Sequence, residues 1–199
     1  MRHAVRVMVD GTVLGLSFAM VAGSAACTEP SSRTCVCDAA PAVDTALVAV
    51  LSKYRAAHHQ ADLREQSGDV ALAIEVMEKA MRTSGGFDVL LARAEVREVR
   101  ADMLARLSEL RSRQGDFEGA ERDVRGGLEL APRDSYFEGH LHETRGINEE
   151  RRAKALMDYG NVQASEVARR AALESFQRAM DVQDRVIRTE LGWDGGYER

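Results

Sequence analysis

Apolar residues recur at helical spacing throughout residues 45–190, and short glycine-containing turns divide this pattern into successive segments. The pattern predicts a first helix over about 45–66, with Thr45 as its N-cap. A turn at Gly68-Asp69 separates it from a second helix over about 70–81. Because the connection is short, we expect these two helices to pack as an antiparallel pair.

A second helix pair is predicted between residues 88 and 132. Its first helix is expected to start near Asp88 and to continue unbroken for about 26 residues. One side of this helix carries an apolar stripe, formed by Val89, Ala92, Val96, Val99, Met103, Leu107 and Leu110. Gly115-Asp116 then turns the chain into the second helix, which ends before Pro132.

A third and fainter pair follows. Its first helix is predicted over about 135–159 or 135–165, and its second helix ends near Glu190. Residues 191–199 form a tail, in which Trp193 is expected to pack back on the last pair. Alternating β-branched runs bounded by turn residues do not occur beyond the N-terminus, so we expect an all-α domain without a sheet.

Two segments repeat the same pattern, at residues 67–81 and 114–132. In each, a Gly-Asp turn is followed by a small residue and then an apolar one, namely Ala73 and Met77 or Ala120 and Val124. This pattern resembles the tetratricopeptide repeat family, whose unit is a helix-turn-helix pair of about 34 residues.

The resemblance is strongest over residues 101–134, looser over 54–87 and weakest over 153–186. It implies a right-handed α-solenoid of about three antiparallel helix pairs. Gly68 and Gly115 are 47 residues apart, which exceeds the usual period of about 34 residues. We therefore expect the additional residues to elongate the first helix of the second pair.

The N-terminus has the features of an export signal. Arg2 and Arg6 precede an uncharged apolar run over residues 13–23, and small residues follow at 24–26. That run is much shorter than the roughly 20 residues that a membrane-spanning helix needs. We therefore predict a secretory signal peptide over residues 1–26, followed by a polar tether over 27–44.

Two cleavage mechanisms remain open at this boundary. Ala25-Ala26-Cys27 resembles the lipobox of bacterial lipoproteins, which implies acylation of Cys27 and anchoring in the cell envelope, in the periplasm or at the outer membrane. Ser24 and Ala26 also suit an ordinary signal peptidase, which would leave a soluble periplasmic or secreted protein. We favour the lipoprotein, because the cysteine lies at the boundary and a polar tether follows it.

The other two cysteines, Cys35 and Cys37, lie in the tether and not in the predicted helical domain. In an oxidising compartment they could form a disulfide with each other or pair between chains. A metal site of the Cys-x-Cys type would need two further ligands, and none lies nearby in the sequence.

Charge and motif content narrow the class of function. The net charge is −5, and acidic and basic residues are interleaved, as in residues 93–113, so no basic stripe suited to nucleic acid is formed. No nucleophile motif or glycine-rich phosphate loop occurs, so we expect no catalytic residues and no cofactor. His58 and Asp62 share a helix face, but the sequence shows no third ligand for a metal ion.

The resemblance implies a binding function, because the first helix of each tetratricopeptide pair lines a concave face. The residues expected on that face are Arg55, His58 and Asp62 in the first pair, and Asp102, Ala105 and Glu109 in the second. We therefore expect a non-catalytic scaffold or adaptor of the bacterial cell envelope that binds a partner protein or peptide and touches the membrane only through its lipid.

Two alternatives stay open. A self-associating structural protein, forming a homo-oligomer, is suggested by the long apolar stripe over residues 88–113. A small metal-binding domain would instead use His58 and its neighbours.

Overall fold

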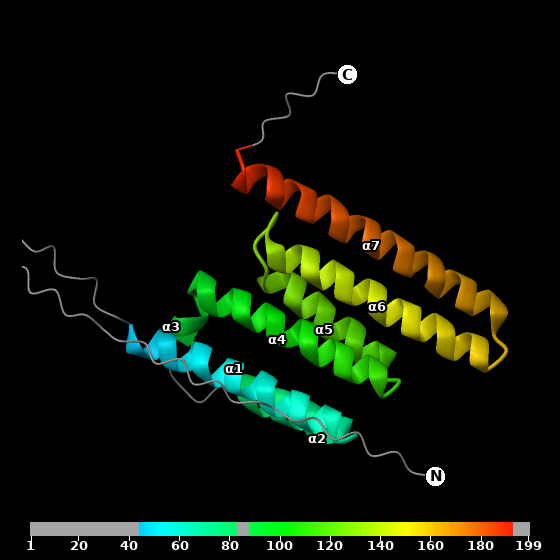
Figure 1. Ribbon diagram of the computed structural model, residues 1–199, viewed down its shortest axis with the longest axis horizontal. Helices are drawn as coiled ribbons and strands as arrows, with labels where there is room; N and C mark the ends of the chain where they lie inside the picture. Colours follow the sequence, from blue (N-terminus) through cyan, green and yellow to red (C-terminus); the bar gives the residue numbers. More distant parts are fainter. Residues whose placement is uncertain (1–43, 83–87, 193–199) are drawn as a thin grey trace, which may run out of the picture. The chain divides into compact units, whose positions relative to one another are not determined.

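The computed structural model describes residues 44–82 and 88–192 (Figure 1). Every regular element within these ranges is helical, so the predicted all-α class is confirmed. The elements are α1 (Thr45–Gln66), α2 (Val70–Met81), α3 (Asp88–Leu91), α4 (Ala94–Arg113), α5 (Phe117–Leu130), α6 (Tyr136–Asp158) and α7 (Val162–Glu190).

Several predictions fall outside the described residues. These are the signal peptide over 1–26, most of the tether with Cys27, Cys35 and Cys37, and the packing of Trp193. Among the helices that are described, none has both the length and the apolar content needed to cross a membrane.

The turns between paired helices share one geometry. The chain leaves the first helix through a glycine with φ between 77° and 85°, a left-handed conformation that favours glycine. The next residue caps the following helix by accepting a hydrogen bond from a backbone amide three positions later, at 2.8–3.2 Å. These turns are Gly68-Asp69, Gly115-Asp116 and Gly160-Asn161.

Two predicted helix boundaries are wrong, and both involve Asp44. The N-cap of α1 is Asp44 and not Thr45, since the Asp44 carboxylate accepts a hydrogen bond from the Leu47 amide at 3.0 Å. The helix expected to run unbroken from residue 88 is also interrupted, because Arg93 has an extended backbone between α3 and α4. Arg93 forms an ion pair with the capping Asp44, which ties the start of α4 to the start of α1.

The helices pack in successive pairs, α1 with α2, α4 with α5, and α6 with α7 (Figure 1). Helix α4 also contacts α1, α2 and α6, and α5 contacts α6. The main core lies between α1, α2 and α4 and includes Tyr54, Met77 and Met103, all fully buried. A smaller cluster of Ala101, Ala105 and Leu141 joins α4 to α6.

The apolar stripe predicted over residues 88–113 packs mostly against other helices of the same chain. Four of its described members, Val96, Met103, Leu107 and Leu110, are buried in the core that α4 forms with α1 and α2. Val99 packs against this core and is partly buried, whereas Ala92 is exposed. This stripe therefore does not offer the surface for self-association that the sequence suggested.

Candidate functional site

A row of polar side chains joins the first helices of the three pairs. His58 on α1 lies with Nε2 3.3 Å from Oδ2 of Asp102 on α4. The other oxygen of Asp102, Oδ1, lies 3.8 Å from Nε2 of His140 on α6. His58 and Asp102 were predicted to share a face, and the structure brings them into contact.

His140 completes this cluster, which we call the His58–Asp102–His140 row. Its Nδ1 lies 3.6 Å from Glu143, and its ring stacks on Tyr136 with the centroids 5.8 Å apart. Burial by itself raises the pKa of Asp102, but the contact with His58 and the charges of His58 and His140 outweigh it. The pKa of Asp102 therefore lies below its usual value, and its carboxylate is ionised at neutral pH.

A second cluster lies one to two helical turns further along α4. The guanidinium of Arg106 contacts Asp62 at 2.7 Å and Glu65 at 2.5 Å, both on α1, and Glu109 at 3.1 Å. The predicted residues Asp62 and Glu109 are thus held in place by one arginine. Sequence reasoning missed Arg106, although its position one turn after Asp102 was a signal that it shares that face.

One predicted binding residue is wrong. Ala105 is fully buried against Ala101 and Leu141, because α6 covers this side of α4. It cannot contact a partner while α4 and α6 remain packed together. Arg55 is exposed on α1, as a binding residue would have to be.

Arg151 on α6 differs from most of the half-buried arginines. Arg106, Arg111 and Arg145 each contact at least one carboxylate at 3.1 Å or less. Among the described residues, Arg151 has no carboxylate within ion-pair distance, and it donates instead to Ser112 Oγ at 2.9 Å and Asn148 Oδ1 at 3.4 Å. Burial and the nearby charge of Arg113 lower the pKa of Arg151.

Arg151 opens onto a shallow cavity of about 520 Å³ at the ends of α4 and α6. The cavity is also lined by Arg113, which is paired with Glu65, and by Lys154, which is paired with Asp158 of the same cavity. The aromatic side chains of Phe117 and Tyr159 complete the lining. Tyr159 is 88% exposed, so its ring is available to a second molecule.

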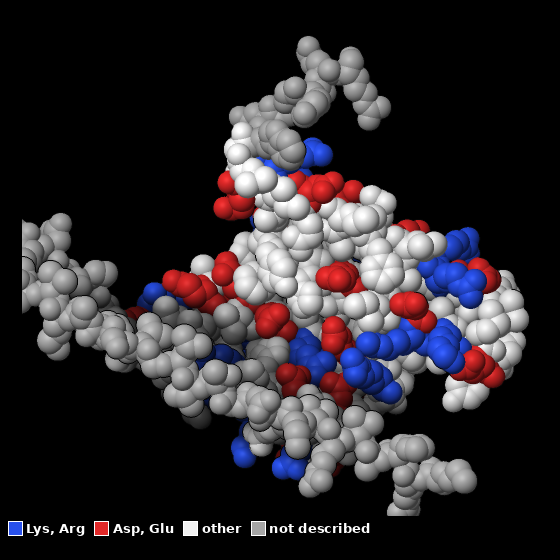
Figure 2. Space-filling view, viewed as in Figure 1, with Lys and Arg blue, Asp and Glu red and all other residues white. Residues whose placement is uncertain are grey.

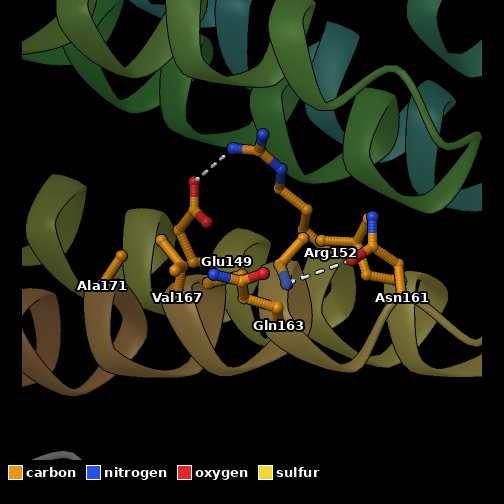
Figure 3. Close-up of a pocket in the computed structure, with 9 residues that line it drawn as sticks. Glu149, Arg152, Asn161, Gln163, Val167 and Ala171 are labelled. Atoms are coloured by element: carbon orange, nitrogen blue, oxygen red, sulfur yellow. Dashed lines mark hydrogen bonds and ion pairs between the residues drawn. The ribbon is translucent and has the colours of Figure 1, made fainter.

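A separate pocket of about 460 Å³ lies between the second half of α6 and the first half of α7 (Figure 3). Glu149 and Arg152 form an ion pair at 3.5 Å on one side, and Val167 and Ala171 line the other (Figure 3). Asn161 is occupied in capping α7. The residues that line this pocket include no nucleophile with an adjacent base, so they offer surface for contact and no catalytic arrangement.

Charges of both signs alternate over the visible surface of the helices, and neither sign forms a broad area of its own (Figure 2). Within residues 44–82 and 88–192, no three His, Cys, Asp or Glu side chains are arranged to hold a metal ion. The hypothesis of a metal site at His58 therefore has no ligand set in the described part of the chain.

Comparison of the chain with known proteins gives no match to a family model, to a curated protein or to a solved structure. The function is therefore inferred from the helix pairs, their turns and the side chains on their surface.

Proposed function

We propose that this protein is a non-catalytic scaffold or adaptor that binds a partner protein or peptide on the face formed by α1, α4 and α6. In this proposal the helix pairs form a right-handed, tetratricopeptide-like solenoid. The supporting observation is that charged side chains from three successive first helices meet in one row, the His58–Asp102–His140 row, which continues through Arg106 towards Arg151.

The dimensions of this face suit an extended peptide. From Asp102 to Arg113 the row follows α4 for about 17 Å, since each helical residue rises about 1.5 Å. An extended chain covers the same distance with roughly five residues. The ion pairs already hold many of these side chains in position, so binding a peptide would require little further ordering of them.

The half-buried Arg151 supplies a specific recognition group within this face. A half-buried cation that no carboxylate contacts directly is stabilised when an anion approaches it, because a charge-assisted hydrogen bond forms where water is partly excluded. The partner segment is therefore expected to place a carboxylate near Arg151, and the exposed ring of Tyr159 offers it an apolar contact.

The export signal and Cys27 support a location in the cell envelope, with a lipid on Cys27 as the anchor. Mass analysis of the mature N-terminus from the native host tests this part of the proposal. Diacyl or triacyl mass on Cys27 is expected, and Cys27→Ala should release the protein from the membrane fraction. An unmodified N-terminus would replace the anchored form with the soluble envelope protein.

Site-specific photocrosslinking in the native host tests the binding face. A photoreactive amino acid at Arg55, which is exposed on α1, should give a discrete adduct, whereas the same amino acid at the exposed Glu129 on α5 should not. The adduct at Arg55 should become weaker in the Arg151→Gln background. Equal adducts at both positions, or an adduct that does not change with Arg151→Gln, would contradict the proposed face.

A further inference from the structure

One flank of α7, about a third of a turn from the side that packs on α6, carries four large exposed apolar residues in one line. Val162, Leu173, Met180 and the C-cap Leu191 have 56%, 64%, 56% and 68% of their surface exposed. They are separated by 11, 7 and 11 residues, so on an α-helix they lie within about 20° of one another. The side of α7 that packs on α6 carries small residues, including Ala168, Ala172 and Ala179.

This row, which we call the α7 stripe, has the charged residues Glu166, Arg169 and Asp184 beside it, in the turns between its apolar members. It extends for about 43 Å along the helix. At Leu173 it continues into a cavity of about 390 Å³ between α6 and α7, which Met157 and Phe176 also line. Uncharged residues, drawn white, predominate where Figure 2 shows the region of α6 and α7. Exposed apolar residues aligned along one helix favour an interaction site in a protein that is otherwise rich in charge.

We propose that a second copy of this chain packs antiparallel on the α7 stripe. The four positions of the stripe are symmetric about a point between Phe176 and Gln177. Leu173 and Met180 are equally far from that point, and so are Val162 and Leu191. When an identical helix lies antiparallel with that point aligned, Leu173 meets Met180 of the other copy, and Val162 meets Leu191 of the other copy. A two-fold interface is self-complementary in this way, because each contact occurs twice.

The charges beside the stripe complement each other in the same register. Arg170 lies opposite Asp184 of the second copy, and Glu166 lies opposite Arg188 of the second copy. Each pair brings together opposite charges, and the two-fold symmetry makes each pair occur twice in the dimer. Oppositely charged flanks specify both the orientation and the register of paired helices.

The size of the contact sets the expected affinity. A strip about 43 Å long and roughly 10 Å wide buries on the order of 400 Å² on each copy. The total of about 800 Å² lies below the roughly 1,200–2,000 Å² of stable specific interfaces and is typical of weak, transient contacts. We therefore expect a weak dimer that forms reversibly at high protein concentration.

Sedimentation velocity of the chain over a range of concentrations tests the interface. A monomer–dimer equilibrium is expected, and Met180→Lys should weaken it at least tenfold by placing a charge in the apolar stripe. Leu63→Lys is the matched control, because Leu63 is 67% exposed on α1 and lies outside the stripe. A monomer at all concentrations, or equal weakening by both variants, would overturn the proposal.

Cysteine crosslinking tests the antiparallel register, in a chain whose Cys27, Cys35 and Cys37 are replaced by serine. A mixture of the Leu173→Cys and Met180→Cys proteins should form mixed disulfides faster than either protein alone. In the proposed register, the two copies of residue 173 are offset by about 10 Å along the helix, beyond the reach of a disulfide. Faster crosslinking of each single variant with itself would indicate parallel packing and overturn the register.

Charge reversal gives an independent measurement. Arg170→Glu and Asp184→Arg should each weaken the dimer, because like charges then face each other across the interface. Mixing the two variants should restore association, since both contacts become attractive in the mixed dimer. Absence of this restoration would contradict the proposed pairing. The measurement does not involve the face of α1, α4 and α6, so its outcome is independent of partner binding there.

Discussion

Replacing each of two adjacent glycines of α5 by alanine should change stability in opposite directions. A Cβ at Gly127 would lie 2.5 Å from Cδ2 and 3.1 Å from Cδ1 of Leu141 on α6. It would also lie 3.4 Å from the carbonyl oxygen of Ala101. A Cβ at Gly126 would meet only Cδ1 of Leu104, at an ordinary contact distance of 3.6 Å.

Both substitutions replace a glycine inside the same helix, so both gain the higher helix propensity of alanine. They differ mainly in the contact that the new Cβ makes. In a helix interior, glycine to alanine is worth about 1 kcal/mol in favour of the folded state. Gly126→Ala should therefore raise the free energy of unfolding by about 0.5–1 kcal/mol. At Gly127 overpacking costs about 1–3 kcal/mol, because the fully buried Leu141 would have to shift within the core. Gly127→Ala should therefore be less stable than Gly126→Ala by about 1–3 kcal/mol.

Urea denaturation followed by far-ultraviolet circular dichroism measures both free energies under the same conditions. Adding Leu141→Ala should relieve the contact, so that Gly127→Ala is less harmful in that background than in the wild type. A Gly127→Ala protein as stable as Gly126→Ala would refute the close approach of α5 and α6 at this position.

Three further outcomes are expected, each measured by urea denaturation. Burial raises the pKa of Asp123 from 3.8 to about 6 despite its contact with Arg111. The folded protein therefore binds this proton more tightly than the unfolded chain does. As the pH falls from 7 to 4, the free energy of unfolding of the wild type should rise by on the order of 1–3 kcal/mol relative to that of Asp123→Asn. A pH-independent difference would contradict this. Arg106→Met should cost about 2–3 kcal/mol by leaving half-buried carboxylates unpaired, whereas Arg55→Met at an exposed position should change little. Asp69→Ala should cost about 1 kcal/mol by removing the cap of α2, and Asp69→Asn should retain most of that stability.

Most helix boundaries follow from local sequence, because a left-handed glycine and a capping side chain act within one turn of the chain. The turns at Gly68-Asp69 and Gly115-Asp116 were predicted from their residues and occur as expected. The turn at Gly160-Asn161 has the same geometry, but asparagine replaces the aspartate that made the first two recognisable. Reading asparagine as an equivalent cap would have located it.

The break before α4 could not be predicted in this way. Nothing in the local pattern around Arg93 interrupts a helix, and the residue is extended where it forms an ion pair with Asp44, 49 positions earlier. The candidate site has the same limitation. His58 and Asp102 could be placed on one face by repeat position, but the contributions of Arg106, His140 and Arg151 depend on how closely α1, α4 and α6 approach one another.

The apolar stripes of α4 and α7 show the difference between local and tertiary information. Both are visible in the sequence as apolar residues at helical spacing, since periodicity depends only on the order of residues along one helix. Burial depends on which other helices lie alongside. Helix α4 packs between α1, α2, α5 and α6, so its stripe is buried and Ala105 is enclosed. Helix α7 packs mainly on α6, so its stripe stays exposed and can meet another molecule.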